Sequence, residues 1–177
     1  MNNYPEAYIA YLVHFHGDRD YFECHEVLEE YWKEETPQER NSHWVGLIQI
    51  AVALYHFRRK NMNGALKTIN KAHSLLINKK KEIDELGIEH SRLLHILNEI
   101  EDRMKKKLPY ESVNLPLNDP GLAAVCRHRC ESEGFVWGGS SNMGASSLVN
   151  RHKTRDRTDI ILERERQLQL RKEKPYP

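Results

Sequence analysis

Hydrophobic residues recur at helical spacing through the first 108 positions of the chain, and no segment alternates as a half-buried strand does. Pro, Gly, Asn and Thr stand between the periodic segments, as is typical of helix boundaries. These signals predict an all-α fold, a compact bundle of about five helices. The predicted helices cover about residues 5–16, 20–35 and 38–60, a fourth segment that begins near 63, and a fifth that carries Leu93, Leu97, Ile100 and Met104.

The pattern changes after residue 108. Residues 109–150 are rich in Pro, Gly and Ser and have few periodic apolar residues, which predicts a long irregular connection. Residues 151–177 carry many charges and a narrow apolar stripe, and they predict a charged C-terminal helix that docks on the body or on a second chain. We therefore divide the chain into a helical core at 1–108, the connection at 109–150 and the C-terminal helix at 151–177.

The stretch from 44 to 56 is almost entirely apolar, with Gln49 inside it and His56 at its end. Such a helix has nearly all its circumference covered by protein, so it should be the central helix of the bundle. Gln49 and His56 fall within about 20° of each other, two turns apart, and form one polar stripe. Gly46 and Ala53 lie beside this stripe and are small enough for a neighbouring backbone to come close. We expect that neighbour to be the preceding helix, with a polar pocket between the two.

The preceding helix carries two polar residues on its apolar side. His25 and Glu29 lie one turn apart between aromatic positions, whereas the other charged residues occupy the opposite face. A carboxylate buried among aromatic rings is costly unless a cation, a metal or hydrogen-bond donors compensate it. Because the connection near Thr36 is short, the two helices should be antiparallel neighbours, and Gln49 and His56 can then face this pair.

Composition narrows the range of partners. The chain has 27 basic and 26 acidic residues, so its net charge favours neither nucleic acid nor an anionic membrane surface. No apolar run approaches the ~18 residues that span a bilayer, and the N-terminus lacks the pattern of a signal peptide. Three cysteines fit reduced thiols better than a disulfide framework. We expect a cytoplasmic protein.

Residues 22–32 and 46–56, with 61–65 after them, resemble a known family. They are similar to the prokaryotic family called domain of unknown function 309, and the resemblance is strong over roughly residues 10 to 80. It implies an all-helical fold. Members of this family have been labelled predicted metal-dependent hydrolases by motif analogy, so the resemblance also implies a metal-dependent activity as an expectation.

The first interpretation of the polar residues is a catalytic metal site. His25, Glu29 and His56 would bind a divalent metal such as zinc, which leaves an open position for an activated water. Glu26, next to His25, would be the general base, and Gln49 would orient or polarise the substrate.

Three other interpretations stay open. In one, these side chains form a buried hydrogen-bonded network that fixes the register of two helices, and the chain is a structural or interaction module. In another, they belong to a metal-free pocket for a small molecule, lined by Tyr21, Tyr31, Trp32 and Tyr55. In the last, Gln49 and His56 simply face water. The expected partners are an unknown small molecule or protein, or a second copy bound through the C-terminal helix.

Residues 126–130 hold a second group of potential ligands. Cys126, His128 and Cys130 would bind zinc only with a fourth ligand nearby, such as Cys24, and their spacing is not that of a zinc knuckle. A structural role for these cysteines is therefore the favoured hypothesis.

Overall fold

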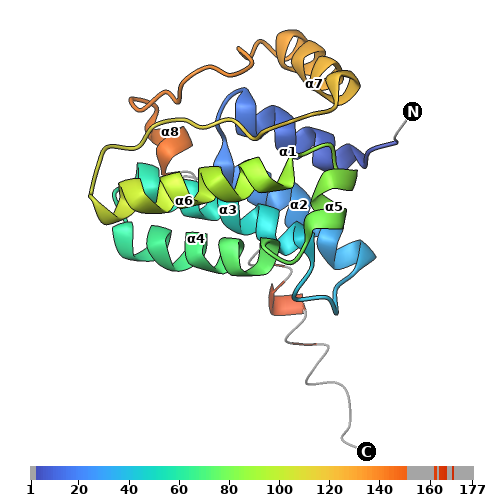
Figure 1. Cartoon of the computed structure of the whole chain (residues 1–177), viewed down its shortest axis with the longest axis horizontal. Helices are drawn as coiled ribbons and strands as arrows, with labels where there is room; N and C mark the ends of the chain where they lie inside the picture. The colour runs from blue at the N-terminus through green and yellow to red at the C-terminus, as the bar shows by residue number, and fades with distance from the viewer. Residues whose placement is uncertain (1–2, 151–161, 163, 167–168, 170–177) are drawn as a thin grey trace, which may run out of the picture.

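The elements of regular structure in the described residues are all helices, which confirms the predicted all-α fold. The computed structural model describes residues 3–150, 162, 164–166 and 169. Its helices, shown in Figure 1, are α1 (Glu6–His16), α2 (Tyr21–Glu35), α3 (His43–Arg58), α4 (Met62–Leu76), α5 (Lys80–Glu85), α6 (His90–Lys105), α7 (Pro120–Ser132) and α8 (Ser146–Val149). Most of the predicted C-terminal helix lies outside the described residues.

Helix α3 is the centre of the bundle. Eleven of its 16 residues are buried, and it packs against α2 on one side and α4 on the other. Helix α1 packs against α2, and α6 packs against α4, so the bundle closes around α3. The predicted central helix is thus confirmed, and its lack of a polar face follows from this position.

Side-chain caps fix where the helices begin. The Asp20 carboxylate accepts a hydrogen bond from the Glu23 backbone N–H at 3.0 Å, so α2 begins at Tyr21. The Ser42 hydroxyl accepts from the Trp44 N–H at 3.2 Å and sets the start of α3. Phe22 near the start of α2 packs on Tyr55 near the end of α3, and Tyr31 packs on Trp44 at the start of α3, so the two helices are antiparallel neighbours, as their short connection predicts.

Gly46 lies against α4, not against α2 as the sequence suggested. A Cβ atom added at this glycine would lie 2.5 Å from Leu76 Cδ2 and 2.6 Å from Leu76 Cγ. Leu76 is completely buried at the end of α4. The small residue therefore allows the close approach of α3 to the following helix.

We expect Gly46→Val to lower the free energy of unfolding by about 1–3 kcal/mol, because the new side chain overlaps Leu76 in a packed core. Urea unfolding of the full chain measures this loss. Leu76→Ala removes the overlapping atoms, so the Gly46→Val, Leu76→Ala double variant should lose less stability than the sum of the two single variants. A Gly46→Val protein as stable as the wild type would contradict this close packing of α3 on α4.

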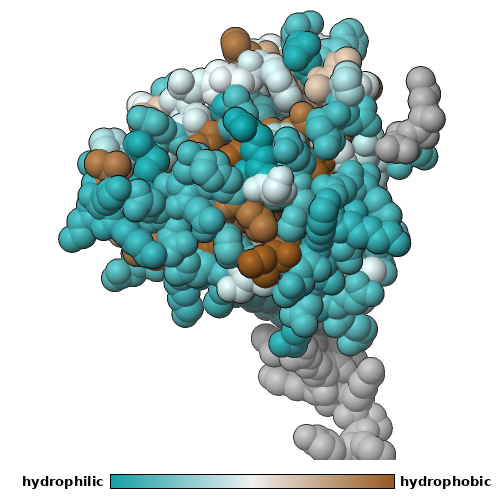
Figure 2. Space-filling view, viewed as in Figure 1, coloured by the Kyte–Doolittle hydropathy of each residue, from teal (hydrophilic) through white to brown (hydrophobic). Residues whose placement is uncertain are grey.

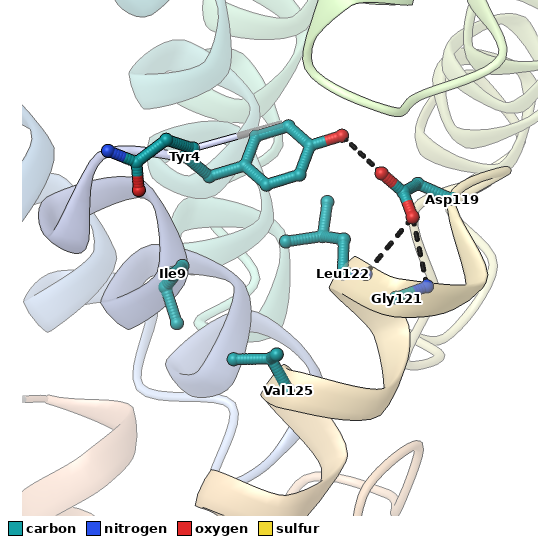
Figure 3. A pocket seen from close by; sticks show the side chains of 7 residues that line it. Tyr4, Ile9, Asp119, Gly121, Leu122 and Val125 are labelled. Carbon is teal, nitrogen blue, oxygen red and sulfur yellow. Dashed lines mark hydrogen bonds between the residues drawn. The ribbon is translucent and has the colours of Figure 1, made fainter. Parts of the chain in front are cut away.

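Residues 109–150 are not wholly irregular, because they contain α7 and the short α8. Asp119 caps α7 by accepting from the N–H groups of Gly121 and Leu122 at 2.9 and 3.2 Å, and Pro120 occupies the first helical position. The Tyr4 hydroxyl donates to the other Asp119 oxygen at 2.6 Å, as Figure 3 shows. This bond ties the start of α7 to the chain just before α1.

The two cysteines of α7 are packing residues. Cys126 and Cys130 are buried one turn apart on the side of α7 that faces α1. The Cys130 thiol donates a hydrogen bond to the Val13 carbonyl oxygen at 3.7 Å. His128 is exposed, and Cys24 is buried against the Tyr11 carbonyl. All three cysteines are free, and within the described residues these groups form no metal cluster.

Figure 2 shows that hydrophilic side chains cover most of this face of the molecule, with small apolar areas between them. Within the described residues, no helix has the length and apolar content that would let it cross a bilayer.

Candidate functional site

His25 lies between two carboxylates of its own helix. Its Nε2 is 3.1 Å from Glu29 Oε2, one turn further along α2, and its Nδ1 is 3.2 Å from Glu26 Oε1. The side chains of all three residues are 30% exposed. The Glu29 carboxylate is therefore only partly buried, and not enclosed among aromatic rings as the sequence pattern suggested. We call these three residues the His25 cluster.

Lys33 completes the surroundings of Glu29. Its Nζ lies 2.9 Å from Glu29 Oε1, one further turn along the same face of α2. The hydrogen bond from His25, together with Lys33, lowers the pKa of Glu29 to about 2 against the opposing effect of burial. The sequence pattern placed Lys33 on the opposite, solvated face of this helix, although its spacing of four residues from Glu29 was the signal that could have identified the contact.

The protonation of His25 follows from the same contacts. Partial burial opposes the charged imidazolium, but the hydrogen bonds and charges of Glu29 and Glu26 outweigh this effect and raise the pKa of His25. Both ring nitrogens face carboxylate oxygens, so the imidazolium can donate to both at once. A metal ion that binds Nε2 must therefore displace one proton.

His56 lines the same hollow between α2 and α3 as His25. The hollow has a volume of about 250 Å³, and we call it the His25 hollow. Its walls are largely apolar, and basic side chains are among the residues that line it. It is lined by Tyr21, Phe22 and His25 of α2 and by Val52, Tyr55, His56 and Arg59 of α3 and its C-terminal end.

The hydrogen bonds of Asn61 determine the tautomer of His56. The Asn61 Oδ1 atom accepts from the Gly64 N–H at 3.2 Å, which leaves the Asn61 amide nitrogen to donate to His56 Nδ1 at 3.1 Å. Because Nδ1 accepts, the proton of the neutral ring is on Nε2. Burial and the nearby Arg59 lower the pKa of His56, which favours this neutral form. His56 is thus set up as a hydrogen-bond donor.

Gln49 lies elsewhere. It lines a separate hollow with Asn70, Lys71 and Ser74 of α4, and its Oε1 atom is buried without a hydrogen-bond partner. The stripe that joins Gln49 to His56 faces α4 at one end and α2 at the other, so the two side chains do not meet at one site.

Two of the four predicted aromatic residues line the His25 hollow, namely Tyr21 and Tyr55. Tyr31 instead packs edge-on against Trp44 with ring centroids 5.3 Å apart. Trp32 donates its indole N–H to the Glu39 carbonyl oxygen at 3.1 Å. These two rings hold the α2–α3 connection and take no part in the hollow.

The His25 cluster offers three potential metal ligands. One atom from each of its three residues lies within 4.8 Å of the others. The 3.1 Å between His25 Nε2 and Glu29 Oε2 is slightly shorter than the separation of about 3.4 Å between two tetrahedral ligands that share one ion at bonds of about 2.1 Å. A carboxylate on the second ring nitrogen, here Glu26, is what orients a metal-bound histidine.

These features describe a small all-helical protein that carries a histidine between two glutamates on its second helix, beside a hollow that residues of the third helix also line. Residues 8–68 match the family model described as domain of unknown function, DUF309. The chain is also similar to the uncharacterized protein YpuF of Bacillus subtilis (strain 168), at 44% identity over 169 residues that cover 96% of this chain and 97% of that protein. The chain belongs to the DUF309 family. No solved structure matches it.

Proposed function

We propose that the chain binds a divalent metal ion such as zinc through His25 and Glu29 and acts as a metal-dependent hydrolase on a small molecule held in the His25 hollow. The observation that supports this proposal is the position of His25, which belongs both to the cluster of ligand atoms and to the wall of the hollow. A bound ion would supply a Lewis acid and an acidic water beside the hollow.

The hydrogen bonds suggest a role for each neighbour of this ion. Glu26 accepts from His25 Nδ1–H, so it fits the carboxylate that orients the ligand better than the general base predicted from the sequence. His56 keeps its proton on Nε2 and therefore fits a donor to the substrate better than a third ligand. Arg59 adds a cation to the lining of the hollow, which favours a substrate that carries negative charge.

Metal binding is the direct test. We expect the full chain, purified without a chelator, to bind one equivalent of Zn²⁺ per chain in a calorimetric titration, and His25→Ala to lose this binding. The matched control is His95→Ala, because His95 and Glu99 form another i, i+4 pair at 3.2 Å that lies exposed on α6. Because Zn²⁺ must displace the His25 proton, its affinity should increase with pH until that proton is gone.

Equal zinc binding by the wild type, His25→Ala and His95→Ala proteins would show non-specific surface binding and contradict the site. Hydrolysis is then tested with small ester and phosphoester substrates, with Glu29→Gln as the inactive variant. Zinc binding without any hydrolysis would keep the metal site and reject the reaction.

A second candidate function is that of a structural or interaction module. The observation that favours it is that the charged groups of the His25 cluster already have partners within the protein. Glu29 already has a cation in Lys33 and a donor in His25, so an ion is not needed to compensate its charge. At 30% exposure this network contributes at most about 1 kcal/mol to folding. Absence of bound metal, with a small loss of thermal stability in His25→Ala, would support this function in place of the first.

A further inference from the structure

A second hollow lies between α6, α7 and the segment that joins these two helices. Its volume is about 370 Å³, and we call it the Arg92 hollow. It shares no lining residue with the His25 hollow, so what it binds is independent of the proposed metal site. The size is within the range of about 300–1,000 Å³ that small-molecule sites occupy.

Two guanidinium groups face this hollow from different helices. Arg92 belongs to α6 and Arg127 to α7, and each side chain is exposed. Neither forms an ion pair with any carboxylate of the described residues, and no Asp or Glu is among the residues that line the hollow. The chain as a whole is nearly balanced, with 27 basic and 26 acidic residues, so the two arginines make a local excess of positive charge. A bound anion would neutralise this charge.

The acceptor atoms of the other polar side chains of the wall already accept hydrogen bonds from within the protein. His16 Nδ1–H donates to the Leu12 carbonyl at 2.9 Å, and His16 Nε2 accepts from the Leu115 N–H at 3.0 Å, so both of its nitrogens are used. The Asn114 Oδ1 atom accepts from Arg19 Nη2 at 2.8 Å, which leaves the amide N–H groups of Asn114 as donors. The wall therefore presents three side-chain donors, namely Arg92, Arg127 and Asn114.

Apolar surface lies next to these donors. The Trp137 ring is stacked on the His16 ring at a centroid distance of 4.4 Å and an interplanar angle of 25°, which holds the indole in place. Ile96 and Leu117 complete this side of the hollow. A ligand with an anionic end and a flat or apolar body would match both halves of the wall.

We propose that the Arg92 hollow binds a small organic phosphate, with its phosphoryl group between Arg92 and Arg127 and its organic part against Trp137. A phosphoryl group carries close to two negative charges at neutral pH and accepts paired hydrogen bonds from planar guanidinium groups. Arginine is better suited than lysine to this recognition, because its donors form a rigid fork. The anionic group and the aromatic wall together distinguish such a ligand from a free inorganic ion.

Calorimetric titration of the full chain with adenosine 5′-monophosphate tests the proposal. We expect saturable binding that weakens by at least about tenfold in the Arg92→Gln, Arg127→Gln double variant, which loses two charge-assisted contacts. The matched control is Lys67→Gln, Lys81→Gln, which removes the same charge from exposed positions outside the hollow and should bind like the wild type. Trp137→Leu should weaken this ligand but leave the binding of inorganic phosphate unchanged.

Titrations with inorganic phosphate and succinate decide the ligand class. Both should bind more weakly than the nucleotide by about tenfold or more, since the first lacks the organic part and the second lacks the phosphoryl group. Equal binding of either one, equal loss in the lysine control, or no loss in the arginine double variant would overturn the proposal. No binding of the nucleotide to the wild type up to about 1 mM would overturn it as well.

Discussion

Replacing Arg19 by methionine is expected to lower the free energy of unfolding by about 3–5 kcal/mol, because a buried network of hydrogen bonds is lost. Arg19 lies in the turn between α1 and α2 and is only 1% exposed. Within the described residues it has no carboxylate partner. Its positive charge is stabilised by hydrogen bonds to oxygen atoms of α1 and of two distant segments, and methionine of similar length can form none of them.

These hydrogen bonds join three parts of the chain. Arg19 Nη1 donates to the carbonyls of Phe15 and Val113 at 3.0 and 2.5 Å, and its Nε donates to the Gly139 carbonyl at 2.8 Å. Without the guanidinium, these three carbonyl oxygens lose their donor inside the protein, at about 1–3 kcal/mol for each one that stays buried. Removal of the buried charge offsets part of this cost, which gives the expected range.

Urea unfolding of the full chain measures the loss, and limited proteolysis shows where it acts. We expect new cleavage in Arg19→Met near Val113 and Gly139, because both segments lose their attachment to α1. The matched control is Arg129→Met, since Arg129 forms surface ion pairs with Glu6 and Glu133 and should cost at most about 1 kcal/mol. A cost no greater in Arg19→Met than in this control would show that the guanidinium does not hold these segments.

The bundle could be predicted from the periodic part of the sequence because each helix is determined by residues close to one another in the chain. Helices α1 to α4 and α6 bury apolar residues at helical spacing, and the boundary residues of these helices act within three or four positions. Helix α7 was missed since its buried stripe consists of Leu122, Cys126 and Cys130, and two cysteines among arginines read as potential ligands. The role of Arg19 could not be predicted, because its acceptors Val113 and Gly139 are backbone groups 94 and 120 residues away.

The same distinction explains how far the site was predictable. The pairing of His25 with Glu29 follows from a spacing of four residues on one helix, and the structure shows them in contact. Whether His56 donates or accepts a hydrogen bond depends on Asn61, which caps α4. Whether Gln49 joins the site depends on how α3 packs between α2 and α4. Such properties arise from the packing of several helices, so the spacing of residues within one helix does not contain them.

Acid should destabilise the protein through His16. This residue is buried at the end of α1, and burial lowers its pKa to about 4 from the ordinary 6.5. Between these two pH values the unfolded chain binds a proton that the folded chain does not, so folding becomes less favourable as the pH falls. At 1.36 kcal/mol per pH unit, this one histidine should remove about 3 kcal/mol of stability between pH 6.5 and pH 4.

The comparison with His16→Gln isolates this effect from other groups that titrate in acid. Glutamine can still accept from the Leu115 N–H but does not ionise, so the difference in unfolding free energy between wild type and variant should shrink by about 3 kcal/mol from pH 6.5 to pH 4. His14→Gln is the control of opposite sign. Burial lowers the pKa of His14, but the hydrogen bond and charge of Asp18 outweigh this effect and raise the pKa overall. Protonation of His14 therefore favours the folded protein as the pH falls. An acid loss that is identical in the wild type and His16→Gln would mean that His16 is not kept neutral by its two backbone partners.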